Sequence, residues 1–137
     1  MPNKVYVDTN IVVDLCDATR PAATRSKEHI ADLVREDVSL FVNADSLSNL
    51  FYVLQTRTKM SLTDVLKKMR EVYKIFELVV TEKNDIDQAL SLCEDPDSDF
   101  KDYEDALQYV CARKIGAGAI LTNDQGFVSP DVPVWRS

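Results

Sequence analysis

The chain has 137 residues, of which 45% are hydrophobic and 28% are charged, as in a single soluble globular domain spanning residues 1–137. Its formal net charge of -7 argues against a protein that coats DNA indiscriminately. Because no apolar run is long enough to span a membrane and no export signal is visible, we expect a cytoplasmic protein without membrane contact.

Short apolar segments rich in β-branched residues alternate with segments whose apolar residues recur at helical spacing. A helix is expected directly after Asp8, with Asp8 or Thr9 as its cap. The other predicted elements, in chain order, are a strand at Lys4–Val7, a helix at Ala22–Arg35, a strand at Ser39–Val42, helices at Ser46–Gln55 and Ser61–Phe76, a strand at Leu78–Thr81, helices at Asp85–Cys93 and Lys101–Lys114, and strands at Ala119–Thr122 and Val132–Trp135.

This alternation predicts the α/β class, with a central, mostly parallel sheet of four to five short strands flanked by helices. Gly116 and Gly118 are expected to end the last helix and to release the chain into the strand at residue 119. Ligands of such folds bind at the carboxyl ends of the strands. Asp8 follows the first strand and Asp124 follows the fourth, so we expect both carboxylates at this edge of the sheet.

The segment "DSDFKDYEDALQ", residues 97–108, begins a helix and is rich in acids. Ser98 or Asp99 is the expected N-cap, and with Asp99 as the cap Asp102 would occupy the third helical position. Asp105 lies one turn further along, on the same side as Asp102, at the edge of a face that should turn toward the core at Ala106 and Leu107. A carboxylate in that position needs a partner.

A divalent cation would be a suitable partner for the Asp105 carboxylate. Three or four carboxylates at one sheet edge repel one another unless a positive charge lies among them, and ligation by oxygen alone suits Mg²⁺ or Mn²⁺. Such ions bind phosphate oxygens and activate water for phosphodiester cleavage. The chain lacks the residues that other kinds of active site need. His29 is the only histidine, no serine lies in a G-x-S-x-G motif, and there are three glycines and no CxxC pair.

Three blocks of sequence, taken together, resemble the motifs of the PIN-domain family. They are "VYVDTNIVVDL", "DFKDYEDALQYVCA" and "AILTNDQGF", and they span nearly the whole chain. The resemblance implies a Mg²⁺- or Mn²⁺-dependent ribonuclease with an acidic pocket at the carboxyl edge of a parallel sheet. Many small members are toxins of VapC-type toxin–antitoxin pairs, so the resemblance also implies an RNA substrate, a cognate antitoxin protein and a homodimer.

The resemblance assigns the site residue by residue. Asp8, Asp105 and Asp124 match the family's catalytic and metal-binding acids, and Asp102 matches an additional acid of members with a D-x-x-D-A pattern. The matching polar positions, which would orient these carboxylates or contact phosphate, are Thr9, Asn10 and Thr122.

One position departs from the family pattern. Asn49, in "SLSNLFYVL", stands where the family has an acid, often glutamate. An asparagine can offer a carbonyl oxygen to a metal but no charge, and Asp45, one turn earlier, is either a helix cap or a partial substitute. We therefore expect one usable metal position and a second, weaker one.

Basic residues gather elsewhere, in and just before the helix predicted at 61–76. They are candidates for contacts with the RNA backbone, or they are solvated beside an apolar face that serves as the dimer or antitoxin groove: Arg57, Lys59, Lys67, Lys68, Arg70 and Lys74.

Two other functions compete with the ribonuclease. A non-catalytic PIN-like scaffold is favoured by Asn49 and disfavoured by the retained acids. A phosphatase or phospho-acceptor domain with Asp8 as nucleophile would need an aspartate at position 10 or a lysine near the end of a late strand, and the chain has neither.

Overall fold

The protein is described here by a computed structural model, which covers residues 2–137. Its centre is a five-stranded sheet in which every pairing is parallel and the strand order is β3-β2-β1-β4-β5. The strands are β1 (Lys4–Val7), β2 (Ser39–Asn43), β3 (Glu77–Val79), β4 (Ala119–Thr122) and β5 (Val134–Arg136). The predicted α/β class and parallel sheet are confirmed.

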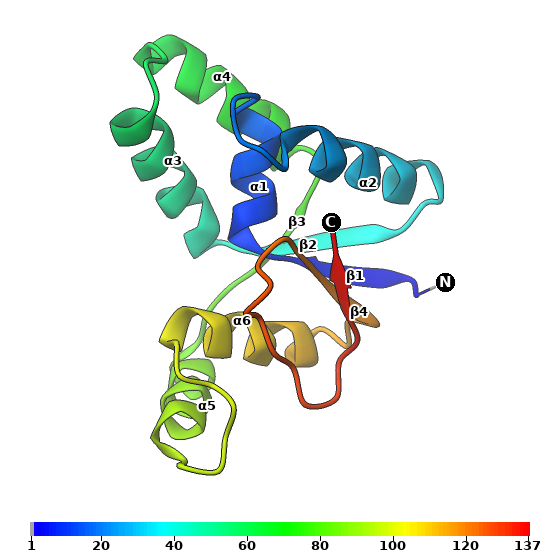
Figure 1. Ribbon diagram of the computed structural model, residues 1–137, viewed down its shortest axis with the longest axis vertical. Coiled ribbons are helices and arrows are strands. Elements are labelled where there is room, and N and C mark those ends of the chain that lie inside the picture. Colours follow the sequence, from blue (N-terminus) through cyan, green and yellow to red (C-terminus); the bar gives the residue numbers. More distant parts are fainter. Residues whose placement is uncertain (1) are drawn as a thin grey trace.

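The helices lie in two groups on opposite faces of this sheet (Figure 1). The larger group comprises α1 (Thr9–Cys16), α2 (Ala23–Arg35), α3 (Asp45–Arg57) and α4 (Leu62–Tyr73). The smaller group comprises α5 (Lys83–Glu94) and α6 (Tyr103–Lys114). No helix within residues 2–137 has the length and apolar character needed to cross a membrane.

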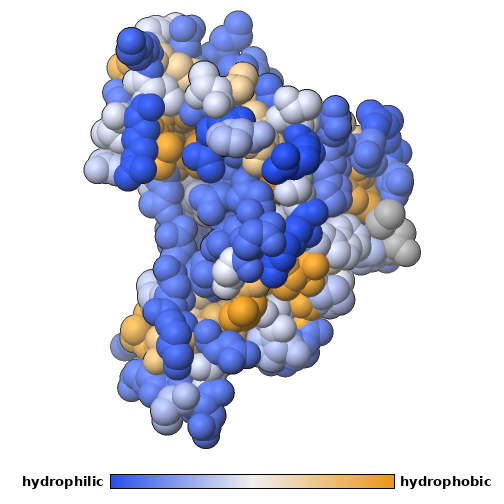
Figure 2. Space-filling view, viewed as in Figure 1, coloured by the Kyte–Doolittle hydropathy of each residue, from blue (hydrophilic) through white to orange (hydrophobic). Residues whose placement is uncertain are grey.

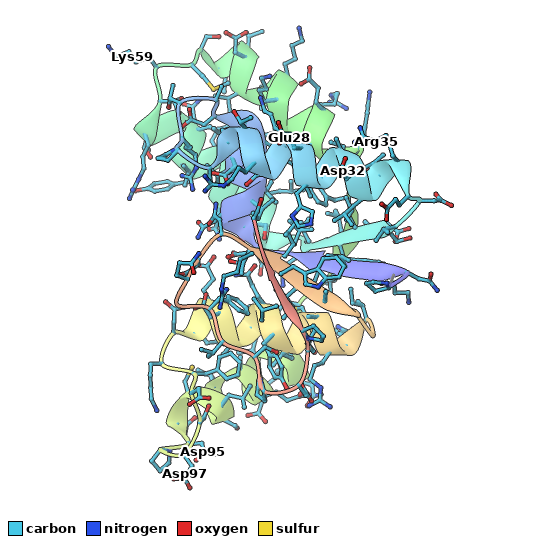
Figure 3. All side chains as sticks on the ribbon, turned by 45° about the vertical axis from the view of Figure 1, so that its right-hand side comes forward. Glu28, Asp32, Arg35, Lys59, Asp95 and Asp97 are labelled. Atoms are coloured by element: carbon cyan, nitrogen blue, oxygen red, sulfur yellow. The ribbon has the colours of Figure 1, made fainter. Side chains whose placement is uncertain are left out.

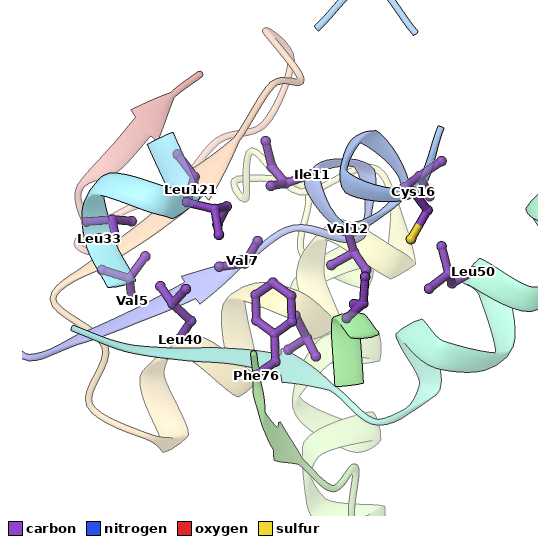
Figure 4. Packing of buried hydrophobic residues seen from close by; sticks show 14 of the residues in the cluster. Val5, Val7, Ile11, Val12, Cys16, Leu33, Leu40, Leu50, Phe76 and Leu121 are labelled. Atoms are coloured by element: carbon purple, nitrogen blue, oxygen red, sulfur yellow. The ribbon is translucent and has the colours of Figure 1, made fainter. Parts of the chain in front are cut away.

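Each face of the sheet has its own apolar core. Val5 and Val7 of β1 pack with Leu121 of β4 against the α1–α4 side, as Figure 4 shows. Tyr6, which lies between Val5 and Val7, and Ile120, which precedes Leu121, join the cluster on the α5–α6 side. All five are fully buried, because successive side chains of a strand point to opposite faces and both faces are covered.

The bounds of three strands differ from the sequence prediction: β2 extends by one residue to Asn43, and β3 and β5 shift at both ends. β5 begins at Val134 rather than Val132, because Pro133 has no N–H to donate; its carbonyl still accepts the N–H of Ile120 at 2.8 Å. β3 is Glu77–Val79 rather than residues 78–81, since the carbonyl of Val80 accepts from the Lys114 ammonium instead of from a neighbouring strand.

Helix boundaries shift for similar local reasons. α4 ends at Tyr73 instead of residue 76, and α5 begins at Lys83 instead of Asp85, whose carboxylate accepts the backbone N–H of Glu82 at 2.9 Å. At the end of α6, Gly116 has a φ of 70°. Its N–H and that of the next residue bond back to the carbonyls of residues 113 and 112, which is the glycine-terminated helix end expected there.

The strand order fixes where a ligand can bind. From β1 the chain moves outward to β2 and β3, and then it crosses to β4 and β5 on the other side of β1. The carboxyl ends of β1 and β4 therefore form the point at which the direction of winding reverses, and ligands of open α/β sheets bind at such points. Asp8 directly follows β1, and Asp124 lies two residues beyond β4.

Candidate active site

Asp8 is a buried carboxylate, only 3% exposed, whose two oxygens are both engaged. Its Oδ1 accepts from the side-chain amide of Gln108 at 3.0 Å and, more weakly, from the backbone N–H of Asn10 at 3.4 Å. Its Oδ2 accepts from the hydroxyl of Thr122 at 2.7 Å. Asp8 thus caps α1, as one of its two predicted roles required, while neighbours from α6 and β4 hold its carboxylate at the sheet edge.

Asp124 is connected to Asp8 through Thr122. The Thr122 hydroxyl that donates to Asp8 also accepts the backbone N–H of Asp124 at 3.0 Å. The Oδ1 of Asp124 accepts the N–H of Gly126 at 2.8 Å, which leaves its Oδ2 for other partners. Arg136 of β5 donates to the carbonyl of Asp124 at 3.0 Å and so anchors the loop.

The start of α6 differs from the sequence prediction. Asp102, not Ser98 or Asp99, is the N-cap: its Oδ1 accepts the backbone N–H of Asp105 at 3.1 Å. Asp105 therefore occupies the third position of the helix instead of lying a turn further in. It remains the half-buried acid of the group, and Asp102 stays exposed.

The electrostatics show that these acids share one region. Burial, and then the charges of Asp102, Asp8 and Asp124, raise the pKa of Asp105 to about 7. The pKa of Glu104, an acid that sequence reasoning did not select, is also raised, first by burial and then by Asp8 and Asp102. Within residues 2–137 none of these acids forms an ion pair with a lysine or arginine.

The donor set fits a hard divalent ion in kind. It consists of carboxylate, hydroxyl and amide oxygens, the ligands that Mg²⁺ and Mn²⁺ prefer, and a cation among them would relieve the repulsion that raises the pKa of Asp105. Across the described part of the chain, no three acidic, histidine or cysteine side chains lie close enough together to hold a metal ion as they stand. The acids interact over Coulombic distances rather than as a preformed set of ligands.

A cavity of about 230 Å³ opens between α3 and α6 beside Asp8. In the space-filling view, mainly hydrophilic side chains border the hollow between the α3–α4 and α5–α6 parts of the molecule (Figure 2). The cavity is lined by Thr9, Asn43, Asp45, Ser46, Asn49, Tyr103, Glu104, Leu107 and Gln108.

Asn49 therefore faces the same space as Glu104 and Gln108, and Asp45 lines it as well. Asp45 is not the cap of α3: Ala44 occupies that position, and the side chain of Asn43 accepts the Asp45 backbone N–H at 2.8 Å.

Gln108 is the main residue of the candidate site that sequence reasoning missed. It is only 4% exposed, and its Oε1 accepts the N–H of Thr9 at 3.2 Å while its amide nitrogen donates to Asp8. The Thr9 hydroxyl in turn pairs with that of Ser46 at 2.8 Å, which ties α1 to α3. A polar residue on the buried side of a helix is the available signal, since it needs a partner.

The basic residues do not gather at the acids. Arg57, Lys59 and Lys68 line a cavity of about 590 Å³ at the far end of α1, about 12 Å along that helix from its cap. Figure 3 shows Lys59 at the end of the molecule remote from α6. Arg70 borders an apolar cavity with Leu66 and other residues of α3 and α4. Lys67 and Lys74 lie on or just after α4.

The three cysteines are free, and burial raises the pKa of Cys16 to about 11, so that it stays protonated.

Comparison with known proteins decides the family. A family model described as "PIN domain" matches residues 4–126. The chain belongs to the PIN-domain family. It is 37% identical over 131 residues to ribonuclease VapC1 of Aquifex aeolicus (strain VF5), an alignment that covers 96% of this chain and 88% of that protein.

Two solved structures share the PIN-domain fold at 16% sequence identity. Mycobacterium tuberculosis VapC20, a toxin that cleaves the sarcin-ricin loop, superposes with a TM-score of 0.72 over 90% of this chain and 92% of its own. A chain of VapBC2 from Rickettsia felis, which was solved bound to a DNA fragment from the VapBC2 promoter, superposes with a TM-score of 0.71. The superposition covers 98% of this chain and 98% of that one.

Proposed function

We propose that this PIN domain is an endoribonuclease that cleaves RNA phosphodiester bonds with carboxylate-bound Mg²⁺ or Mn²⁺. The observation that carries the proposal is the group of mutually repelling acids at the winding reversal of the sheet, where Asp105 has a pKa raised to about 7. The 37% identity to a ribonuclease over nearly the whole chain supports the same reaction.

The residues have separate roles in this proposal. Asp8, Asp105 and Asp124, with Asp102 at the rim, would hold the ion, which when bound lowers the pKa of a water and stabilises the leaving oxygen. Gln108 and Thr122 fix both oxygens of Asp8, so that this carboxylate is oriented before any ion arrives. Thr9, Asn10 and Asn49 are proposed polar contacts to the ligands or to phosphate.

The cleavage experiment uses purified protein and RNA with Mg²⁺ or Mn²⁺, and then with excess chelator. Asp8→Asn and Asp105→Asn should abolish cleavage, because each removes a negatively charged ligand. Asp87→Asn, an exposed aspartate of α5, is the matched control and should cleave normally. Cleavage that continues in excess chelator would rule out the metal mechanism.

We also propose that the protein is the toxin of a toxin–antitoxin pair and forms a homodimer. The VapBC2 structure supports an antitoxin partner by analogy of fold. An exposed apolar surface supports a protein contact on the α3–α4 side: Leu62, Leu66 and Tyr73 are each about half exposed, and the last two border an apolar cavity of about 340 Å³. Co-expression with the product of a short upstream reading frame tests this partner.

A non-catalytic scaffold is the second candidate, and it is favoured by the uncharged Asn49 in the cavity beside Asp8. Calorimetric titration with Mn²⁺ separates the two candidates. A scaffold would show no binding that Asp8→Asn removes.

A further inference from the structure

Asp14 is a carboxylate with no exposed surface, six residues after Asp8 and within α1. A buried charge is stable only when it is paired and hydrogen-bonded. Its Oδ1 accepts from the Nε of Arg20 at 2.6 Å. Its Oδ2 accepts from the hydroxyl of Ser26 at 2.6 Å and from the side-chain amide of Asn123 at 2.5 Å. These residues come from α1, the α1–α2 connection, α2 and the loop after β4.

Only one of these three bonds leads to the acidic site. Asn123 stands between Thr122, which donates to Asp8, and Asp124. Arg20 and Ser26 belong to the α1–α2 part of the molecule and join Asp14 to it. The bond from Asn123 therefore connects the α1–α2 unit to the segment that carries Asp124.

The loop is fixed on its other side as well. Arg136 donates to the carbonyls of Asp124 and Phe127, each at 3.0 Å, from β5. With Asn123 held by Asp14 and the far end held by Arg136, the backbone at Asp124 is supported from both directions. Without the bond to Asp14, the side chain of Asp124 would be freer to move relative to Asp8.

We propose that Asp14 is a positioning residue: through Asn123 it sets the place of Asp124 relative to Asp8, and thereby the affinity of the site for a divalent ion. This inference rests on the proposed function. Removing a group that orients a metal ligand, without binding the metal itself, lowers metal affinity by about 10- to 100-fold. A purely structural role, in which Asp14 only fastens α1 to α2, predicts lower stability with unchanged affinity.

Ser26 provides the matched control, since Ser26 and Asn123 donate to the same oxygen of Asp14. Ser26→Ala and Asn123→Ala each remove one donor from that oxygen, but only Asn123→Ala cuts the connection to Asp124. Titration calorimetry of the folded proteins with Mn²⁺ gives the affinity, and thermal unfolding without metal gives the stability. Asp14→Asn serves as a third variant if it folds.

We expect Asn123→Ala to weaken Mn²⁺ binding by about 10-fold or more. Ser26→Ala should keep nearly the Mn²⁺ affinity of the unmodified protein, even if it lowers the melting temperature more than Asn123→Ala does. Equal affinities for the two variants, whether both reduced or both normal, would overturn the positioning role. If Asp8→Asn abolishes binding in the same series, the proposed function survives that result. If the unmodified protein binds no Mn²⁺, the proposed function itself fails and takes the inference with it.

Discussion

Asp105 should make the stability of the metal-free protein fall as the pH rises. Its pKa is 3.8 in the unfolded chain and about 7 in the fold, so between these values the folded state holds a proton that the unfolded state has released. The folded state binds more protons in this window, and the free energy of unfolding therefore decreases from about pH 4 to about pH 7.

The size of this effect has an upper limit. One proton of difference changes the free energy of unfolding by at most ~1.4 kcal/mol per pH unit. The slope will be smaller because Asp105 is only half-buried and solvent screens part of the repulsion. Glu104, whose pKa is raised as well, adds to the slope in the same direction. Asp105→Asn should remove most of the slope and leave the contribution of Glu104.

Urea unfolding at a series of pH values, in chelator and again with Mn²⁺, measures how the free energy of unfolding depends on pH. We expect Asp105→Asn to be more stable than the unmodified protein near pH 7 in chelator, and nearly equal to it near pH 4. Mn²⁺ should stabilise the unmodified protein near pH 7 and have little effect on the variant. Asp87→Asn controls for the removal of one acid on the surface. Identical slopes for Asp105→Asn and the unmodified protein would refute the assignment of the raised pKa.

Three further predictions concern substrate, metal and support. Replacing Lys67 and Lys68 by alanine should flatten the salt dependence of RNA binding by about 0.7 in log–log slope for each phosphate that these lysines neutralise, and an unchanged slope would make the two residues merely solvated. Asn49→Glu should lower the Mn²⁺ concentration needed for half-maximal cleavage; an unchanged requirement with normal cleavage places Asn49 outside the ligand set. Gln108→Leu should cost about 1–3 kcal/mol in urea unfolding, because it strips a donor from Asp8 inside the protein, and a stability equal to the unmodified protein would contradict this.

The sequence predicts the sheet well where burial alone decides. Lys4–Val7 and Ala119–Thr122 have the predicted bounds, because both are central strands covered on two faces and so read as short continuous apolar runs. The edge strands β3 and β5 shift by one or two residues at their ends. There the ladder competes with single side-chain contacts, such as that of Lys114 with Val80, which no local pattern reveals.

The start of α6 shows why caps are harder to place. Ser98 has the character of a cap, but its hydroxyl accepts the N–H of Phe100 and shapes a turn instead. After that turn the side chain of Phe100 packs in the core, where it is only 1% exposed. Its ring lies beside that of Tyr109, with 5.0 Å between the ring centroids. Burial of a large aromatic side chain outweighs one capping bond, so the helix begins later, at the next good cap, Asp102.

The candidate site divides in the same way. Asp8 and Asp124 could be placed at one edge of the sheet because strand direction and order dictate it. Gln108 and Asn123 could not, because their roles depend on partners 100 and 109 residues away in the chain. The sequence distinguishes residues that follow strands, whereas the residues that orient them are selected by tertiary packing.

The register between β1 and β4 links Asp8 and Asp14 to consecutive residues of the segment that leaves β4. Val7 pairs with Leu121, so the residues that come next in the chain, Asp8 and Thr122, lie against each other. One residue further, Asn123 reaches Asp14. The two aspartates are about 9 Å apart along the axis of α1, and the chain leaving the sheet beside this helix spans that distance with two successive side chains. The positioning role proposed for Asp14 therefore depends on the spacing within α1, and a residue inserted between Asp8 and Asp14 should break one contact or the other.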